Sequence, residues 1–161
     1  MKQKEAIPST TRKGSVSVPD RLRELDRTED FAVLATADKG IPYASLVSFA
    51  LTADLKQGIF ATPRGTRKYK NIVNSRNAAL LIDSRSRKKK GLMETEAVTI
   101  IGNGSPVKKG RMWDGLAAIF TKKHPDLEEF IYSPSTALIV IDIIRCIHVS
   151  RFQTVSVWDC T

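Results

Sequence analysis

The feature that most constrains the fold of this chain is a series of short apolar segments, many of them rich in β-branched residues, separated by turns. Amphipathic stretches of helical period lie between some of them, but without the regular β-α-β alternation of a parallel sheet. This order predicts a mainly β fold with added helices, in which six to seven antiparallel strands form a closed or partly closed, Greek-key-like barrel. The predicted strands cover residues 31–36, 42–51, 59–62, 77–82, 97–101, 136–149 and 152–158.

Four short helices are predicted from apolar spacing and from end signals. Thr66 is placed as the cap of the second helix, and Pro125 suits the first turn of the fourth. The glycine-rich segment 102–106 is expected to end the strand that precedes it. The predicted helices cover residues 19–27, 66–75, 111–121 and 125–132.

Length and composition indicate one compact domain. The 161 residues divide into a flexible N-terminal arm, 1–18, and a barrel domain, 19–161. No apolar run approaches the roughly 20 residues that a membrane crossing needs, and the N-terminus lacks the apolar core of a secretory signal. A cytoplasmic protein without membrane contact is therefore expected. Its two cysteines are too few for a disulfide framework or a structural zinc site.

Positive charge is concentrated in one segment. Residues 64–90 contain ten basic side chains and one acidic side chain, which equals the net charge of +9 of the whole chain. A local excess of this kind indicates a local partner such as a phosphate or a nucleic acid, or a solvated surface. Within it, the basic loop 85–90 has no interleaved aromatic residue for base stacking, so a solvated hairpin loop is favoured over a nucleic-acid patch.

The start of the second predicted helix has the pattern of an anion site. A strand ends at Thr62, a turn containing Arg64 follows, and Thr66 caps a helix whose first residues are Arg67 and Lys68. Cations are disfavoured at a helix N-terminus, where free N–H groups already carry partial positive charge. A phosphate bound there by backbone amides, the Thr66 hydroxyl and the basic side chains would explain the pattern. A solvated, lysine-rich helix end is the alternative.

The second predicted strand is built from small residues. Ala44, Ser45, Ser48 and Ala50 stand among larger apolar residues such as Leu46 and Val47. Small side chains expose backbone amides, to which a flat heteroaromatic ring could hydrogen-bond along its edge. The alternative is a strand that another element crosses closely.

In this order of elements, with Thr62-x-x-x-Thr66-Arg67-Lys68 opening a helix, the chain resembles the pyridoxamine 5′-phosphate oxidase-like family of FMN-binding split barrels. The resemblance covers residues 19–158 and is most specific in 62–82. It implies that Thr62, Thr66, Arg67 and Lys68, with Arg64 beside them, hold the phosphate and ribityl end of FMN. It also implies that strand residues 44–47 contact the isoalloxazine through their backbone, and that two subunits pair with the flavins between them.

Two departures separate this chain from the true oxidases of that family. The strand 43–49 has no Arg or Lys, and the C-terminal segment has no Arg-x-His pair to grip a pyridoxal substrate. FMN binding is therefore expected to transfer, and pyridoxamine phosphate oxidation is not. The prediction is an FMN-dependent oxidoreductase, a homodimer acting on a small molecule. The alternatives are a non-catalytic flavin or haem carrier or sensor, and a small basic barrel that binds nucleic acid.

The remaining candidate residues give weaker signals. No acid, base or nucleophile can be assigned a catalytic role, and no metal site is predicted. His124 is expected at the surface, His148 as a hydrogen-bonded barrel residue, and Trp113 in the core. The resemblance places Trp158 near the flavin or the dimer seam. Cys160 is expected to be exposed.

Overall fold

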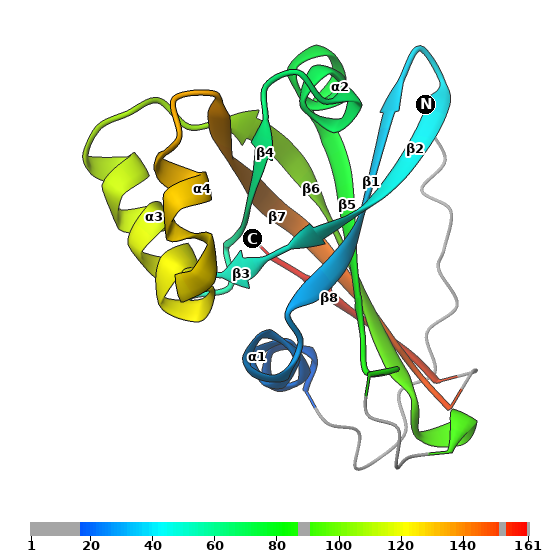
Figure 1. The fold of residues 1–161 in the computed structure, drawn as a ribbon. Helices are drawn as coiled ribbons and strands as arrows, with labels where there is room; N and C mark the ends of the chain where they lie inside the picture. The colour runs from blue at the N-terminus through cyan, green and yellow to red at the C-terminus, as the bar shows by residue number, and fades with distance from the viewer. Residues whose placement is uncertain (1–16, 87–90, 152–153, 161) are drawn as a thin grey trace.

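The structure, a computed structural model, describes residues 17–86, 91–151 and 154–160. Eight antiparallel strands form one sheet in the order β2-β1-β5-β6-β7-β4-β3, and β8 also pairs with β7. The sheet curls into a barrel because its outermost strands, β2 and β3, follow each other in the chain (Figure 1). The strands are β1 (Phe31–Asp38), β2 (Ile41–Ser48), β3 (Ala50–Leu51), β4 (Gln57–Pro63), β5 (Asn77–Asp83), β6 (Glu96–Pro106), β7 (Thr136–Ser150) and β8 (Thr154–Asp159).

The mainly β barrel predicted from the sequence is confirmed, with one strand more than expected. The predicted strand 42–51 is divided at Phe49 into β2, which pairs with β1, and β3, which pairs with β4. Phe49 is held between them by a hydrogen bond from its amide to the carbonyl of Asp30 (3.4 Å) and by Nε2 of His124 on its carbonyl (2.7 Å). The break lets one continuous segment pass from one side of the barrel to the other.

The prediction that residues 102–106 end the strand predicted at 97–101 is wrong. β6 continues to Pro106 and pairs with β7 on both sides of a bulge at Ile101/Gly102. The glycines permit close approach: a Cβ at Gly102 would lie 2.2 Å from the carbonyl oxygen of Asp142, and one at Gly104 would lie 2.7 Å from Ile72. These residues therefore admit neighbouring elements and do not end the strand.

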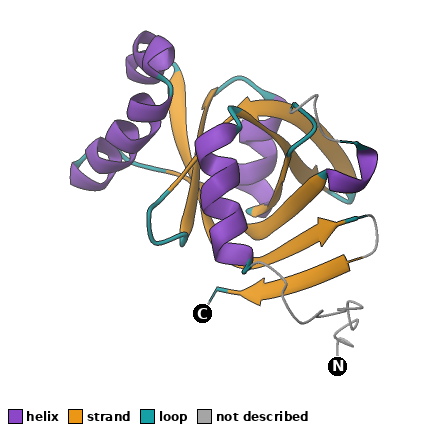
Figure 2. Cartoon of the chain, turned by 90° about the horizontal axis from the view of Figure 1, so that it is seen from below, coloured by secondary structure: helices purple, strands orange, loops and turns teal. Residues whose placement is uncertain are grey.

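The helices cover the barrel at both ends and on one side. In Figure 1, α1 (Val18–Thr28) lies at one end and α2 (Arg67–Ser75) at the other, and Figure 2 shows α1 across its end. α3 (Arg111–Lys123) and α4 (Glu128–Tyr132) pack together beside β4. Short 3₁₀ turns cover Leu92–Glu94 and Pro125–Leu127. The predicted arm lies outside the described residues up to 16; Ser17 caps α1, which begins at Val18.

Two hydrophobic cores result. The larger fills the barrel, with α1 contributing Leu22 and Leu25 to it, both completely buried. The smaller lies between α3, α4 and the outside of the sheet, and includes Trp113 at 3% exposure, as predicted. None of the described helices combines the length and the apolarity needed to cross a membrane. The cytoplasmic location stays a prediction.

Candidate functional site

The N-terminus of α2 carries two threonine hydroxyls in direct contact. Thr66 is the N-cap, with extended backbone, and its hydroxyl accepts a weak hydrogen bond from the Tyr69 amide at 3.4 Å. The hydroxyl of Thr62, at the end of β4, lies 2.7 Å from that of Thr66. The first amides of a helix have no acceptor within the helix, so those of Arg67 and Lys68 are available at this end. The four residues of the predicted phosphate motif are thus grouped at one helix end.

The charges at this end all have one sign. The first turn of α2 has no acidic residue, Arg67 is exposed, and Lys68 is half-buried. Arg64 is oriented differently, because its guanidinium donates to the carbonyl of Pro134 at 2.6 Å. Its amide also donates to the carbonyl of Ser135 at 3.0 Å. Arg64 therefore ties the turn to the segment before β7, whereas Arg67 and Lys68 provide the positive charge at the helix end.

α2 is fixed in position by its buried side. Asn71 is 3% exposed, and its Nδ2 donates to the hydroxyl of Thr36 in β1 at 3.0 Å. Ile72 is completely buried against Gly104 of β6. Arg76 ends the helix in a left-handed conformation, and its carbonyl accepts the Gly104 amide at 2.7 Å. These contacts fix the position of α2 on the barrel.

The strand predicted to contact a ring is an edge strand. β2 has β1 on one side and ends the order of the sheet on the other, so one row of its backbone groups is not used by the β1 ladder. Among the predicted residues, Ala44 and Leu46 are exposed, whereas Ser45 lies opposite the buried Leu34 and Val47 opposite the buried Ala32. The four residues thus divide between the outer and inner faces of the barrel wall.

Sequence reasoning missed Tyr43 as part of this region. Its ring lies 6.0 Å from the guanidinium carbon of Arg67, within the range of a cation–π contact. This contact connects β2 directly to the basic end of α2. Its aromatic ring beside a short run of small residues was the available signal.

The outer face of β2, β1 and β5 is apolar. Val33 lies opposite Leu46 on one side and Leu81 on the other, and the next row consists of Ala44, Ala35 and Ala79. Leu46 is 61% exposed. It lines a pocket of about 410 Å³, together with residues of the α1–β1 connection and the end of β5. The pocket therefore adjoins the predicted ring-binding strand and not the end of α2.

Ser45 gives a prediction about stability. Its Oγ is buried and has no hydrogen-bond partner among the described residues. A buried hydroxyl without a partner retains its desolvation cost, so we expect Ser45→Ala to leave the free energy of unfolding unchanged or to raise it by up to about 1 kcal/mol. Urea denaturation measures this. A loss of more than about 1 kcal/mol would mean that the hydroxyl has a stabilising partner.

Trp158 does not join this group within one chain. It pairs with Cys146 of β7, while Thr62 pairs with Ala137. Ala137 and Cys146 are nine positions apart along β7, which is about 30 Å. The predicted role of Trp158 at a flavin therefore requires a second subunit.

Both histidines are buried and hydrogen-bonded. The prediction that His124 lies at the surface is wrong: it is 5% exposed, and its Nε2 contacts the carbonyl of Phe49. His148 is a hydrogen-bonded barrel residue as predicted, with its Nε2 2.8 Å from the Glu96 carboxylate. Across residues 17–86, 91–151 and 154–160, no group of three side chains could hold a metal ion.

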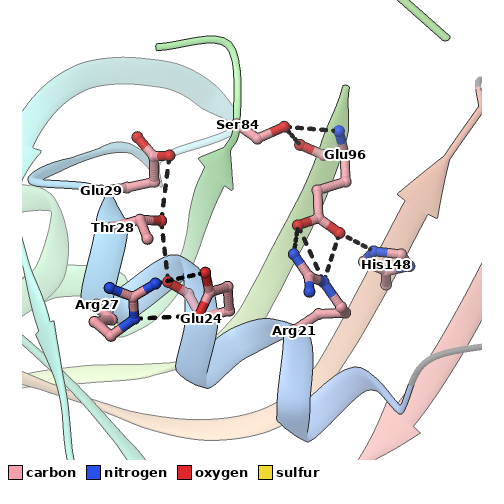
Figure 3. Close-up of polar contacts among 8 residues, drawn as sticks. All are labelled: Arg21, Glu24, Arg27, Thr28, Glu29, Ser84, Glu96 and His148. Atoms are coloured by element: carbon pink, nitrogen blue, oxygen red, sulfur yellow. Dashed lines mark hydrogen bonds and ion pairs between the residues drawn. The ribbon is translucent and has the colours of Figure 1, made fainter. Parts of the chain in front are cut away.

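A second polar cluster joins α1 to the barrel (Figure 3), and α1 lies at the opposite end from α2 (Figure 1). The Glu96 carboxylate accepts from Arg21 Nε at 2.9 Å and contacts His148, while its backbone is bonded to Ser84. Burial raises the pKa of Glu96, but the hydrogen bonds and charges of His148 and Arg21 outweigh burial and lower it to about 2. We interpret the contacts of Glu96 with Arg21 and His148 as a structural anchor for α1.

A family model described as pyridoxamine 5′-phosphate oxidase matches residues 18–150, which include the α2 motif and strands β1 to β7. The chain belongs to this family. The resemblance inferred from the sequence is thereby confirmed. No protein with curated annotation matches the chain in sequence.

Solved structures of related fold include proteins of different description. A haem-binding protein from Mycobacterium smegmatis superposes with a TM-score of 0.79 at 16% identity, covering 90% of this chain and 59% of that one. The haem storage protein HutZ from Vibrio cholerae gives 0.68 at 14% identity, covering 80% and 91%. A structure described as a putative pyridoxamine 5′-phosphate oxidase from Listeria innocua gives 0.60 at 14% identity, covering 89% and 100%. At these identities the likeness establishes the split-barrel fold, and this chain spans less than two thirds of the mycobacterial protein.

The side chains present fit a mononucleotide and a haem unequally. The end of α2 offers the hydroxyls, amides and cations that a phosphate requires. A haem iron commonly takes an axial histidine, and the two histidines of this chain are both buried and engaged. The described side chains therefore fit a mononucleotide better than a histidine-ligated haem.

Proposed function

We propose that this chain binds FMN, with the phosphate at the N-terminus of α2. The observation that carries the proposal is the contact between the Thr62 and Thr66 hydroxyls at a helix end that bears Arg67 and Lys68 and no acidic residue. Thr66 and the free amides would bind the phosphate oxygens, and the two basic side chains would neutralise their charge. Thr62 is only 1% exposed, so it would act by holding the Thr66 hydroxyl in place through the contact between the two side chains.

The strand β2 would bind the ring system. Its free edge offers backbone N–H and C=O groups, and the exposed Ala44 leaves a flat surface beside them. Bound flavin would supply hydride or single-electron transfer to a small-molecule substrate, which does not require an acid or base from the protein. We therefore propose an oxidoreductase, in which the chain places the flavin and excludes water from one side of it.

We further propose that the active form is a homodimer that uses the outer face of β2, β1 and β5. Four exposed apolar residues lie on this face or on the adjoining β6. A contiguous apolar surface of this kind is typical of an interface, and a partner subunit would cover it. A second subunit would also account for the position of Trp158, which lies far from α2 in its own chain. These apolar residues are Phe31, Leu46, Leu81 and Ile101.

Haem binding is the second candidate. It is favoured by the fold likeness to the mycobacterial haem-binding protein and the Vibrio haem storage protein. It would require an axial ligand other than His124 and His148 as they are placed here, or a rearrangement that frees one of them. Titration with haemin separates the candidates: a sharp Soret band with a stoichiometry of one per chain would favour haem.

A charge-removal variant tests the FMN proposal. Arg67→Ala/Lys68→Ala deletes two charge-assisted contacts, so we expect FMN affinity to fall by about 100-fold, with the melting temperature nearly unchanged. Affinity is measured by quenching of flavin fluorescence.

The matched control is Arg23→Ala/Lys122→Ala, which removes the same charge from exposed positions on α1 and α3. This control is expected to bind FMN like the unmodified chain. An equal loss of FMN affinity in both variants would mean that the effect comes from net charge alone. An unaltered FMN affinity in the α2 variant would reject the phosphate site.

A further inference from the structure

The two cysteines lie near each other on the inner side of β7 and β8. Cys146 is opposite Trp158, and the amide of Cys160 donates to the carbonyl of Ile144 at 2.9 Å. Residues two apart on a strand share a face, so Cys160 is the diagonal neighbour of Cys146 across the strand pair. The two cysteines, which are fourteen residues apart in the chain, are therefore neighbours in the fold.

The surroundings of the two thiols differ. Cys146 is completely buried in the barrel core. Cys160 is half-buried against the same core, and its Sγ donates a weak hydrogen bond to the carbonyl of Leu55 at 3.6 Å. The expectation that Cys160 is exposed is therefore wrong, since its thiol points inward. Both sulfurs are free thiols in this structure.

We propose that Cys146 and Cys160 form a redox-sensitive pair, which a hydroperoxide converts into an intramolecular disulfide joining β7 to the end of β8. The hydroperoxide takes two electrons: the Cys160 thiol forms a sulfenic acid and releases water or an alcohol. The Cys146 sulfur then attacks the Cys160 sulfur, the S–S bond forms, and a water molecule leaves with the proton of Cys146. A dithiol reverses the reaction.

The order of the two steps follows from burial. Burial, together with the neighbouring Cys160, raises the pKa of Cys146 to about 12, so this thiol stays protonated and does not meet the oxidant first. Cys160 is the more accessible sulfur and reacts first. The reaction is expected to be slow, because the resolving thiol carries little thiolate at neutral pH.

The disulfide requires a small movement. Diagonal neighbours in an antiparallel pair have Cα atoms about 7–8 Å apart, whereas a disulfide holds them at roughly 4.4–6.8 Å. Cys160 follows the last residue of β8, Asp159, so its movement would cost the hydrogen bond of its own amide to Ile144 and leave the pairing of β8 itself in place. Oxidation would therefore pull the end of β8 toward the core and shift the surroundings of Trp158.

Treatment of the purified chain with hydrogen peroxide, followed by alkylation and peptide mass spectrometry without reductant, tests the proposal. We expect both thiols to become resistant to alkylation, a loss of two hydrogens per chain, and one cross-linked peptide pair containing Cys146 and Cys160. Tryptophan fluorescence should change with the same time course and recover with dithiothreitol. Cys160→Ser should show neither the cross-link nor the fluorescence change.

Three outcomes would overturn it. One is oxidation of Cys160 to sulfinic acid while Cys146 stays open to alkylation after unfolding. Another is a disulfide that joins two chains only. The third is a cross-link that forms in urea and not in the folded chain. None of these depends on whether the chain binds flavin, so the pair and the proposed function fail or stand separately.

Discussion

Glu96→Ala is expected to lower the free energy of unfolding by about 3 kcal/mol. The substitution removes the carboxylate that joins Arg21 of α1 to His148 of β7. Both side chains then lose this hydrogen-bond partner while they remain largely buried. Removing one member of a buried ion pair typically costs about 3–5 kcal/mol, and the exposure of Arg21 places this case at the lower end. Urea denaturation at neutral pH measures the loss. Arg23→Ala, which breaks an exposed pair with Asp20 on the same helix, should cost less than about 1 kcal/mol.

The same carboxylate gives the stability a pH dependence of known sign. The pKa of Glu96 is about 2 in the folded chain and near its ordinary value of 4.5 when unfolded. Its stabilisation is therefore complete above about pH 4.5 and is lost as the pH falls toward 2. The free energy of unfolding should therefore fall between pH 4.5 and pH 2 by about 3 kcal/mol less in Glu96→Ala than in the unmodified chain. If the free energy of unfolding changed with pH in the same way in Glu96→Ala and in the unmodified chain, this interpretation of the cluster would be contradicted.

Gly102→Val is expected to destabilise the barrel by about 3 kcal/mol or more. A Cβ at this position would lie 2.2 Å from the carbonyl oxygen of Asp142 and 2.8 Å from the Ile141 side chain. The first contact is with backbone, so β6 and β7 must separate at their bulge, where both strands are paired on either side. Overpacking of this kind typically costs about 1–3 kcal/mol, and loss of ladder hydrogen bonds adds to it. Thermal and urea denaturation both measure it.

Gly115→Ala is expected to raise the free energy of unfolding in the same assay. Gly115 lies within α3, and a Cβ there would meet nothing within 4 Å. Alanine favours helix over glycine by about 1 kcal/mol, so this variant should gain stability. If Gly102→Val retained the stability of the unmodified chain, the close approach of the two strands would not be a requirement of the fold.

The sequence was informative where a local pattern decides the structure. Short apolar segments bounded by turns predicted the strands near β1, β4, β5 and β7, and the Thr66 cap predicted the start of α2. It was misleading where tertiary contacts override local signals. The glycines of 102–106 look like a strand break, yet they are needed because β7 and α2 pass close to β6. The division at Phe49 depends on His124, which lies 75 residues away in the chain.

The candidate site was predictable to a similar extent. The threonine and basic residues of α2 are adjacent in sequence and remain adjacent in the fold. The cation–π contact of Tyr43 with Arg67 could not be predicted, because it depends on how β2 twists past the helix. Trp158 lies on β8, beside the end of β7 that is far from Thr62, so nothing in its local sequence indicates how it relates to the site.

Comparison of FMN with riboflavin in the cofactor-free chain tests the central claim most directly. The two ligands share the ring and ribityl chain and differ only in the phosphate, which we assign to Thr66, Arg67 and Lys68. Charge-assisted hydrogen bonds to that group predict about 100-fold tighter binding of FMN than of riboflavin. Added inorganic phosphate should weaken the binding of FMN and leave the binding of riboflavin unchanged. Equal affinities for the two flavins, measured by fluorescence quenching, would contradict the account.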